Sequence, residues 1–130
     1  MVLWRSDLIC IVDDDESVRE ATKALLRSAG YQAQTFASAE SLFSSGILKE
    51  TECLILDVRM PGMDGLEMLS RVINFGFRIP VIFITAHADG RLRRLAVGAG
   101  AADLLAKPFR ARDLLQIVES VLNVKAGSSA

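Results

Sequence analysis

The feature that most constrains this chain is a repeated alternation between short apolar runs and segments whose apolar residues recur at helical spacing. Five runs are typical of β-strands, and they lie at 8–12, 32–36, 53–56, 81–85 and 102–105. Strand–helix units in such a succession predict an α/β domain that has a parallel sheet with helices on both faces. The runs at 8–12, 53–56 and 81–85 are almost continuously apolar, as strands covered on both faces are.

The helical segments have recognisable ends. The first apolar stripe, within 18–29, stops at Gly30, because glycine readily adopts the left-handed conformation that ends many helices. The second helix is short, with Ser38 as its N-cap and Gly46 as its stop. Three further stripes lie within 66–73, 92–99 and 114–122.

Length and composition predict one soluble domain. The chain has 130 residues, 51% of them hydrophobic and 24% charged, and a net charge of −1. We expect a single domain over 1–124, followed by a flexible tail or the start of a linker at 125–130. The near-zero net charge argues against binding of nucleic acid or membrane by this domain alone.

The chain has no sequence feature of a secreted or membrane protein. No apolar run reaches the roughly 18 residues of a membrane span, and the N-terminus lacks a signal-peptide core, so we expect a cytoplasmic location. Cys10 and Cys53 lie in apolar runs, which favours buried free thiols over a disulfide or a metal role.

Polar side chains follow the apolar runs where each predicted strand ends. Asp13 and Asp14 follow the first run and Asp57 follows the third. Thr85 ends the fourth run, and Lys107 follows the fifth. Ligands of open parallel sheets bind outside the carboxyl ends of the strands, so we expect these side chains to converge on one edge.

This set of side chains predicts phosphoryl chemistry. Carboxylates without histidine or cysteine suit a hard cation, most simply Mg²⁺, held by few protein ligands and several waters. An aspartate beside such a cation can act as a nucleophile. A lysine and a hydroxyl nearby would bind an oxyanion, and phosphoryl transfer needs mainly positioning and charge neutralisation.

These motifs together resemble the receiver domain of two-component response regulators, the CheY-like fold. The matching segments are the aspartate pair, LDVRMPGMDG, ITA and KPF, which occur in the family's order. The resemblance extends from Leu8 to about Leu122. It implies a (βα)5 flavodoxin-like fold with a five-stranded parallel sheet of order 2-1-3-4-5.

The resemblance implies a role for each acidic residue. Asp57 would accept a phosphoryl group from the phosphohistidine of a sensor histidine kinase. Asp14 and Asp57 would bind Mg²⁺ directly, and Asp13 would act on it through water. The backbone carbonyl of Arg59 would be the remaining protein ligand.

The resemblance also implies roles for the other side chains of the set. Lys107 would bind a phosphoryl oxygen, and its peptide bond to Pro108 is expected to be cis. Thr85 would hydrogen-bond the phosphoryl group and draw the following loop inward. The domain would catalyse its own phosphorylation and dephosphorylation, without being an enzyme for an external substrate.

The segments VRMPGMDGLEML, PVIFITAHAD and GAGAADLLAKPF are similar to receivers of the nitrogen-fixation-regulator type. Such receivers usually precede a LuxR-type DNA-binding domain, so control of transcription through an output domain is expected. The alternatives are a stand-alone receiver that acts through protein partners and a pseudo-receiver that works without phosphorylation. A homodimer through the fourth helix, fifth strand and fifth helix is a further expectation. A dehalogenase-like phosphatase is disfavoured, because Asp57 follows the third strand rather than the first.

Leu104 departs from the family pattern. It stands three residues before Lys107, where most receivers have an aromatic ring that moves inward behind the threonine on phosphorylation. We favour a plain core leucine, with Thr85 coupling kept and a smaller change at the fourth helix and fifth strand.

Three further features allow two interpretations each. His87 and Arg59 each lie two residues past a site residue and would slow the attack of water on the aspartyl phosphate; alternatively, His87 is a solvated loop residue. The arginines at 91, 93 and 94 form either a partner surface or a solvated charged face. Asp15 with Glu16 would begin the first helix, and a capping box of Ser17 with Glu20 is the rival.

Overall fold

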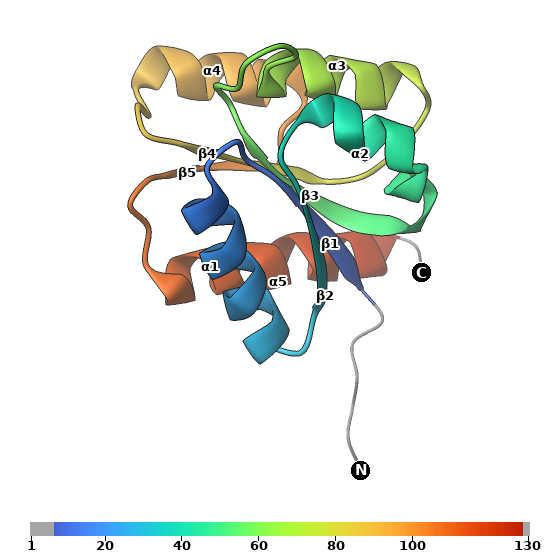
Figure 1. Ribbon diagram of the computed structural model, residues 1–130, viewed down its shortest axis with the longest axis vertical. Coiled ribbons are helices and arrows are strands. Elements are labelled where there is room, and N and C mark those ends of the chain that lie inside the picture. Colours follow the sequence, from blue (N-terminus) through green and yellow to red (C-terminus); the bar gives the residue numbers. More distant parts are fainter. Residues whose placement is uncertain (1–6, 129–130) are drawn as a thin grey trace.

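The computed structural model describes residues 7–128, in which strands and helices alternate as the sequence predicts (Figure 1). The elements are β1 (Leu8–Val12), α1 (Glu16–Ser28), β2 (Gln32–Phe36), α2 (Ala39–Ser45), the 3-10 helix η1 (Ile47–Glu50), β3 (Thr51–Asp57), α3 (Gly65–Asn74), β4 (Val81–Thr85), α4 (Gly90–Ala99), β5 (Asp103–Ala106) and α5 (Ala111–Ser128). None of the helices in this part of the chain is long and apolar enough to cross a bilayer.

The strands form one parallel sheet of order β2-β1-β3-β4-β5, which confirms the predicted order. Helices α1 and α5 cover one face, and α2, α3 and α4 cover the other (Figure 1). After β1 the chain forms β2 on one side of β1, and it then crosses back to form β3 on the other side of β1. This change of direction opens a crevice at the carboxyl ends of β1 and β3, where α/β proteins bind ligands.

Each face of the sheet has its own apolar core. Side chains of a strand alternate between the faces, so Cys10 points to the α2–α3–α4 side while Ile9 and Ile11 point to the α1–α5 side. All five residues of β1 and of β4 are buried, which is why their sequences are apolar without alternation. Cys10 and Cys53 are buried thiols that form no disulfide within the described residues, as predicted.

The bounds of two strands differ from the prediction. β3 starts at Thr51, because Thr51 pairs with Leu8 of β1, and it includes Asp57. The Thr51 hydroxyl donates to the Ile47 carbonyl at 2.8 Å, across the preceding 3-10 turn. β5 begins at Asp103, one residue later than predicted, because the ladder with β4 pairs Asp103 with Ile82. Apolar composition alone does not reveal where a hydrogen-bonded ladder begins.

The cap of α1 settles one of the open alternatives. An Asp15 carboxylate oxygen accepts from the backbone N–H groups of Ser17 at 2.9 Å and Val18 at 3.3 Å, so Asp15 is the N-cap. Glu20 instead pairs with Lys23, and the rival capping box is wrong.

The other predicted helix ends are confirmed. Ser38 caps α2, and Gly30 and Gly46 follow α1 and α2 with φ of 94° and 73°. The flexible tail at 125–130 stays a prediction; the backbone of α5 is helical through Ser128, and 129–130 lie outside the described residues.

Candidate functional site

The acidic residues meet at the carboxyl edge of the sheet. β1 and β3 are neighbours, and their register pairs Val12 with Leu56, so the next residue of each strand, Asp13 and Asp57, comes to the same place. Asp14 completes the group, and one carboxylate oxygen from each aspartate lies within 4.8 Å of the others.

Asp13 is fully buried, and both its carboxylate oxygens and its backbone carbonyl accept hydrogen bonds. One carboxylate oxygen accepts from the backbone N–H of Asp15 at 2.9 Å, and the other accepts from the Lys107 ammonium at 2.8 Å. Its backbone carbonyl accepts from the Arg19 guanidinium at 2.8 Å. These hydrogen bonds fix the position of Asp13 in the site. Asp14, in contrast, is exposed and carries no hydrogen bond among the described residues.

Asp57 is buried beside Asp13 and shares its lysine. Its Oδ1 accepts from the backbone N–H of Arg59 at 3.2 Å, and its Oδ2 accepts from the Lys107 ammonium at 3.3 Å. Burial raises the pKa of the Asp57 carboxyl, and the charge of Asp13 raises it further. The positive charge of Lys107 and the hydrogen bonds lower this pKa but do not offset the other two effects.

Lys107 bridges the two buried carboxylates from the far end of the chain. Burial on its own would lower the pKa of its ammonium group, but the hydrogen bond to Asp13 and the charges of Asp13 and Asp57 outweigh burial and raise it. The Lys107–Pro108 peptide bond is cis, as predicted.

Thr85 lies at the same edge, on the strand next to β3. Its side chain is buried, and its hydroxyl oxygen accepts from the backbone N–H of His87 at 3.2 Å. Its backbone carbonyl accepts from the Lys107 N–H at 2.7 Å. Thr85 therefore connects the loop after β4 to the segment that carries the lysine.

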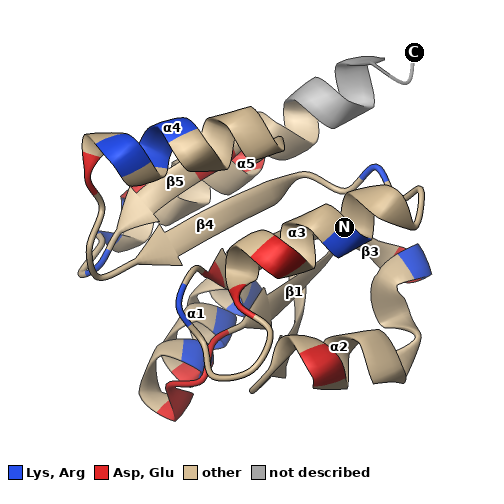
Figure 2. Ribbon diagram, turned by 90° about the horizontal axis from the view of Figure 1, so that it is seen from above, with Lys and Arg blue, Asp and Glu red and all other residues tan. Residues whose placement is uncertain are grey.

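The remaining predicted residues lie around this group. Arg59 and His87 are exposed on the loops that follow β3 and β4. Leu104 is buried in the core beneath α4, which agrees with a plain core leucine; its part in switching stays a prediction. The arginines at 91, 93 and 94 are exposed on α4, whose basic residues are visible in Figure 2.

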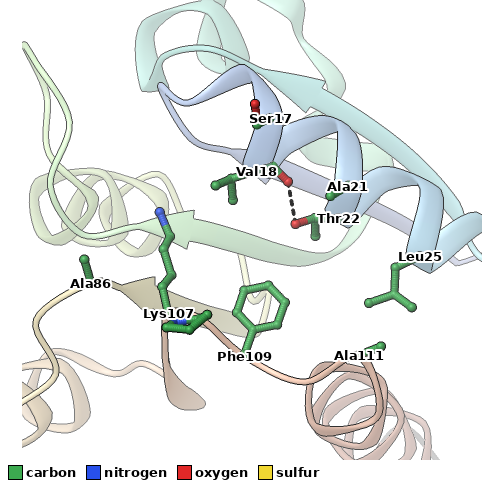
Figure 3. Close-up of a pocket in the computed structure, with 10 residues that line it drawn as sticks. Ser17, Val18, Ala21, Thr22, Leu25, Ala86, Lys107, Phe109 and Ala111 are labelled. Carbon is green, nitrogen blue, oxygen red and sulfur yellow. Dashed lines mark hydrogen bonds between the residues drawn. The ribbon is translucent and has the colours of Figure 1, made fainter.

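Sequence reasoning missed a groove beside the site. It has a volume of about 660 Å³ and lies between α1 and the segment that begins α5 (Figure 3). Val18, Leu25 and Phe109 give it an apolar lining, and Lys107 stands at one end. The Thr22 hydroxyl donates to the Val18 carbonyl at 2.7 Å, so its polar group is satisfied within α1. Phe109 directly after the lysine–proline pair was the signal that could have indicated the groove.

The donor set fits a hard divalent cation. The carboxylates of Asp13, Asp14 and Asp57 supply only oxygen ligands, and the described residues include no histidine or cysteine in this cluster. Oxygen donors with one solvent-exposed member leave room for water ligands, as Mg²⁺ prefers.

The family follows from this arrangement together with one comparison. A family model described as the response regulator receiver domain matches residues 9–119. This chain belongs to the response regulator receiver family. The family, the CheY-like fold and the role of receiver in two-component signalling are thereby confirmed, and such receivers interact with histidine kinases.

The relatives that this receiver matches include response regulators and transcriptional regulatory proteins. It is 41% identical to the response regulator protein TmoT of Ectopseudomonas mendocina over 120 residues, which are 92% of this chain and 54% of that protein. It is 37% identical over 116 residues to the transcriptional regulatory protein FixJ of Azorhizobium caulinodans, covering 89% of this chain and 55% of that protein. The solved response regulator StyR superposes with a TM-score of 0.86 at 39% identity, over 96% of this chain and 63% of that one. This receiver therefore spans about half the length of the curated relatives it matches.

Proposed function

We propose that this receiver takes a phosphoryl group from a kinase phosphohistidine onto Asp57, with Mg²⁺ as cofactor. The observation that carries the proposal is the site itself, in which Asp13, Asp14 and Asp57 converge and Lys107 bridges two of them. A lone carboxylate on a strand end would be a weak indication. A convergent acidic group with a shared, partly buried lysine supplies the positioning and charge neutralisation that phosphoryl transfer to an aspartate needs.

The step follows from the positions of these groups. A carboxylate oxygen of Asp57 attacks phosphorus, the O–P bond forms as the N–P bond breaks, and the imidazole nitrogen keeps the electron pair. The Lys107 ammonium lies 3.3 Å from Asp57 Oδ2, so it can bind a negatively charged phosphoryl oxygen once the group is transferred to Asp57. Asp13, Asp14, Asp57 and the Arg59 carbonyl would hold Mg²⁺, which neutralises charge on the carboxylates and the phosphoryl oxygens.

Thr85 is proposed to convert phosphorylation into a change of shape. Its hydroxyl oxygen now accepts from the His87 N–H. A hydroxyl that turns to donate to a phosphoryl oxygen alters that contact and moves the loop after β4. Because Leu104 offers no ring to bury behind Thr85, we expect a smaller change along α4 and β5 than an aromatic residue would give.

The receiver is also proposed to catalyse loss of its own phosphoryl group, at a rate that two neighbouring side chains reduce. Arg59 and His87 are exposed on the loops that border the site, where water must approach the aspartyl phosphate. Both side chains would hinder that water and lengthen the lifetime of the phosphorylated form.

The partners are proposed from two surfaces. The apolar groove beside Lys107 suits the histidine kinase, because a partner seated there would bring its phosphohistidine next to the site (Figure 3). α4 exposes Leu95 and Val97 beside its arginines, which supports a homodimer through the α4–β5–α5 face on phosphorylation. The relatives' length and names support a DNA-binding output domain as the target; a stand-alone receiver is the alternative. The cytoplasmic location stays a prediction.

Intact mass after incubation with acetyl phosphate tests the proposal. We expect one phosphoryl adduct that needs Mg²⁺ and is absent from Asp57→Asn. Asp64→Asn is the matched control, because Asp64 is an exposed aspartate that caps α3, and it should still be phosphorylated. An unmodified wild-type protein in the presence of Mg²⁺ would favour a pseudo-receiver.

A further inference from the structure

The loop between β3 and α3 is held by a side chain from α2 that the proposed reaction does not use. Glu40 Oε2 accepts from the backbone N–H of Met63 at 3.2 Å, across 23 positions of sequence. The Met63 side chain is buried in the core, so the contact joins α2 to an anchored point of the loop.

Two hydrogen bonds within the segment itself fix the ends of this loop. The Arg59 N–H donates to Asp57 Oδ1 at 3.2 Å, and the Gly65 N–H donates to the Val58 carbonyl at 2.9 Å. Met63 lies two residues before the start of α3, and Glu40 is the side chain from another element that hydrogen-bonds this part of the loop among the described residues. The loop is therefore held next to β3 by Asp57, and just before α3 by a side chain of α2.

Gly62 allows this close approach. Its φ of 75° is in the left-handed region, and a Cβ at this position would lie 2.8 Å from Glu40 Oε2. Any larger residue would push the carboxylate away from the Met63 N–H, so the sequence of the loop and the position of Glu40 depend on each other.

We propose that Glu40 is a positioning residue for the cation site. It holds the loop in the conformation in which the Arg59 carbonyl can join Asp13, Asp14 and Asp57 as a ligand. This inference rests on the proposed function, because it assigns Glu40 an effect on the cation that the site would hold. Among the described residues, the Glu40 side chain forms no hydrogen bond with the proposed cation ligands.

The competing explanation is local. Glu40 is the acidic residue in the first turn of α2, where negative charge suits the helix dipole. A residue with that role alone would alter the stability of α2 and leave the loop unchanged. Glu40→Gln separates the two, because glutamine loses the charge but keeps an oxygen that can accept from Met63. Glu50→Ala is the charge control, since Glu50 is exposed in the neighbouring η1 and its side chain forms no hydrogen bond or ion pair within the described part of the chain.

The first measurement uses the metal-free protein. Amide hydrogen exchange followed by NMR should show faster exchange of the Met63 N–H in Glu40→Ala, by about three- to tenfold, as expected for the loss of one typical hydrogen bond at an exposed side chain. Glu40→Gln and Glu50→Ala should keep the wild-type rate. An unchanged rate in Glu40→Ala would overturn the proposed contact.

The second measurement is a Mg²⁺ titration followed by the amide shifts of Asp57 and Arg59. Half-saturating Mg²⁺ should rise about three- to tenfold in Glu40→Ala and stay near wild type in the other two variants. The rate with acetyl phosphate at saturating Mg²⁺ should be unchanged, because the chemical groups are intact. Wild-type Mg²⁺ affinity in Glu40→Ala would overturn the inference alone, whereas a wild-type protein that neither binds Mg²⁺ nor gains a phosphoryl group would overturn the proposed function.

Discussion

Replacing Lys107 by methionine should destabilise the metal-free protein and make it more responsive to Mg²⁺. Methionine keeps most of the length of the side chain but removes the ammonium that lies 2.8 Å from Asp13 and 3.3 Å from Asp57. Two buried carboxylates then face each other without a cation between them. The substitution removes the positive charge of Lys107 and leaves the fully buried Asp13 carboxylate without its ion-pair partner.

The size of the effect can be estimated from these distances. Two like charges separated by up to 4.8 Å repel by about 3 kcal/mol at an effective dielectric constant near 20. Breaking a fully buried pair costs about 3–5 kcal/mol, and the 19% exposure of the Lys107 side chain places this case at the lower end. We therefore expect a loss of about 3 kcal/mol, which is about 10 °C in Tm for a domain of this size.

Urea unfolding followed by circular dichroism, with EDTA and with saturating Mg²⁺, measures both parts of this prediction. Mg²⁺ would bind the same carboxylates, so it should stabilise Lys107→Met more than wild type and recover part of the loss. Lys23→Met is the control, because Lys23 forms a helix-surface pair with Glu20 and should change stability by less than about 0.5 kcal/mol. A Lys107→Met protein as stable as wild type in EDTA, or one that gains no more than wild type from Mg²⁺, would refute the reasoning.

Two further predictions concern the same edge of the sheet. A Cβ at Gly65 would lie 2.5 Å from the Asp57 carbonyl oxygen and 2.9 Å from Phe83, so Gly65→Ala should lower the free energy of unfolding in urea by about 2 kcal/mol. Gly98 in α4 has open space around it, so Gly98→Ala should raise the free energy of unfolding by about 0.5–1 kcal/mol. Equal effects of the two substitutions would contradict this explanation. Burial and then the Asp13 charge raise the pKa of Asp57, so the native state binds this proton more tightly than the unfolded chain. The stability that the Asp57 proton contributes is complete below the unfolded pKa and is lost as the pH rises through the raised one. In EDTA, Asp57→Asn should therefore gain stability over wild type across that interval, and a difference that is constant with pH would disprove it.

The order of the fold was predictable because it depends on local patterns. Apolar runs at 8–12 and 81–85 coincide with β1 and β4, since strands buried on both faces need apolar residues at every position. The strand boundaries at Thr51 and Asp103 were not predictable, because a hydrogen-bonded ladder is set by the partner strand. The choice of Asp15 as the cap of α1 likewise depended on backbone geometry that residue types do not reveal.

The sequence by itself determined which side chains reach the site. Parallel strands end at one edge, so Asp13, Asp57, Thr85 and Lys107 had to meet there once the strands were recognised. Only the tertiary structure decided how they meet. Lys107 bridges Asp13 and Asp57 across 94 and 50 positions of sequence, and the Glu40 contact with the loop likewise joins distant elements. Such contacts depend on distances of a few ångströms between separate elements, and those distances are set by how helices and strands pack rather than by the order of residues along the chain.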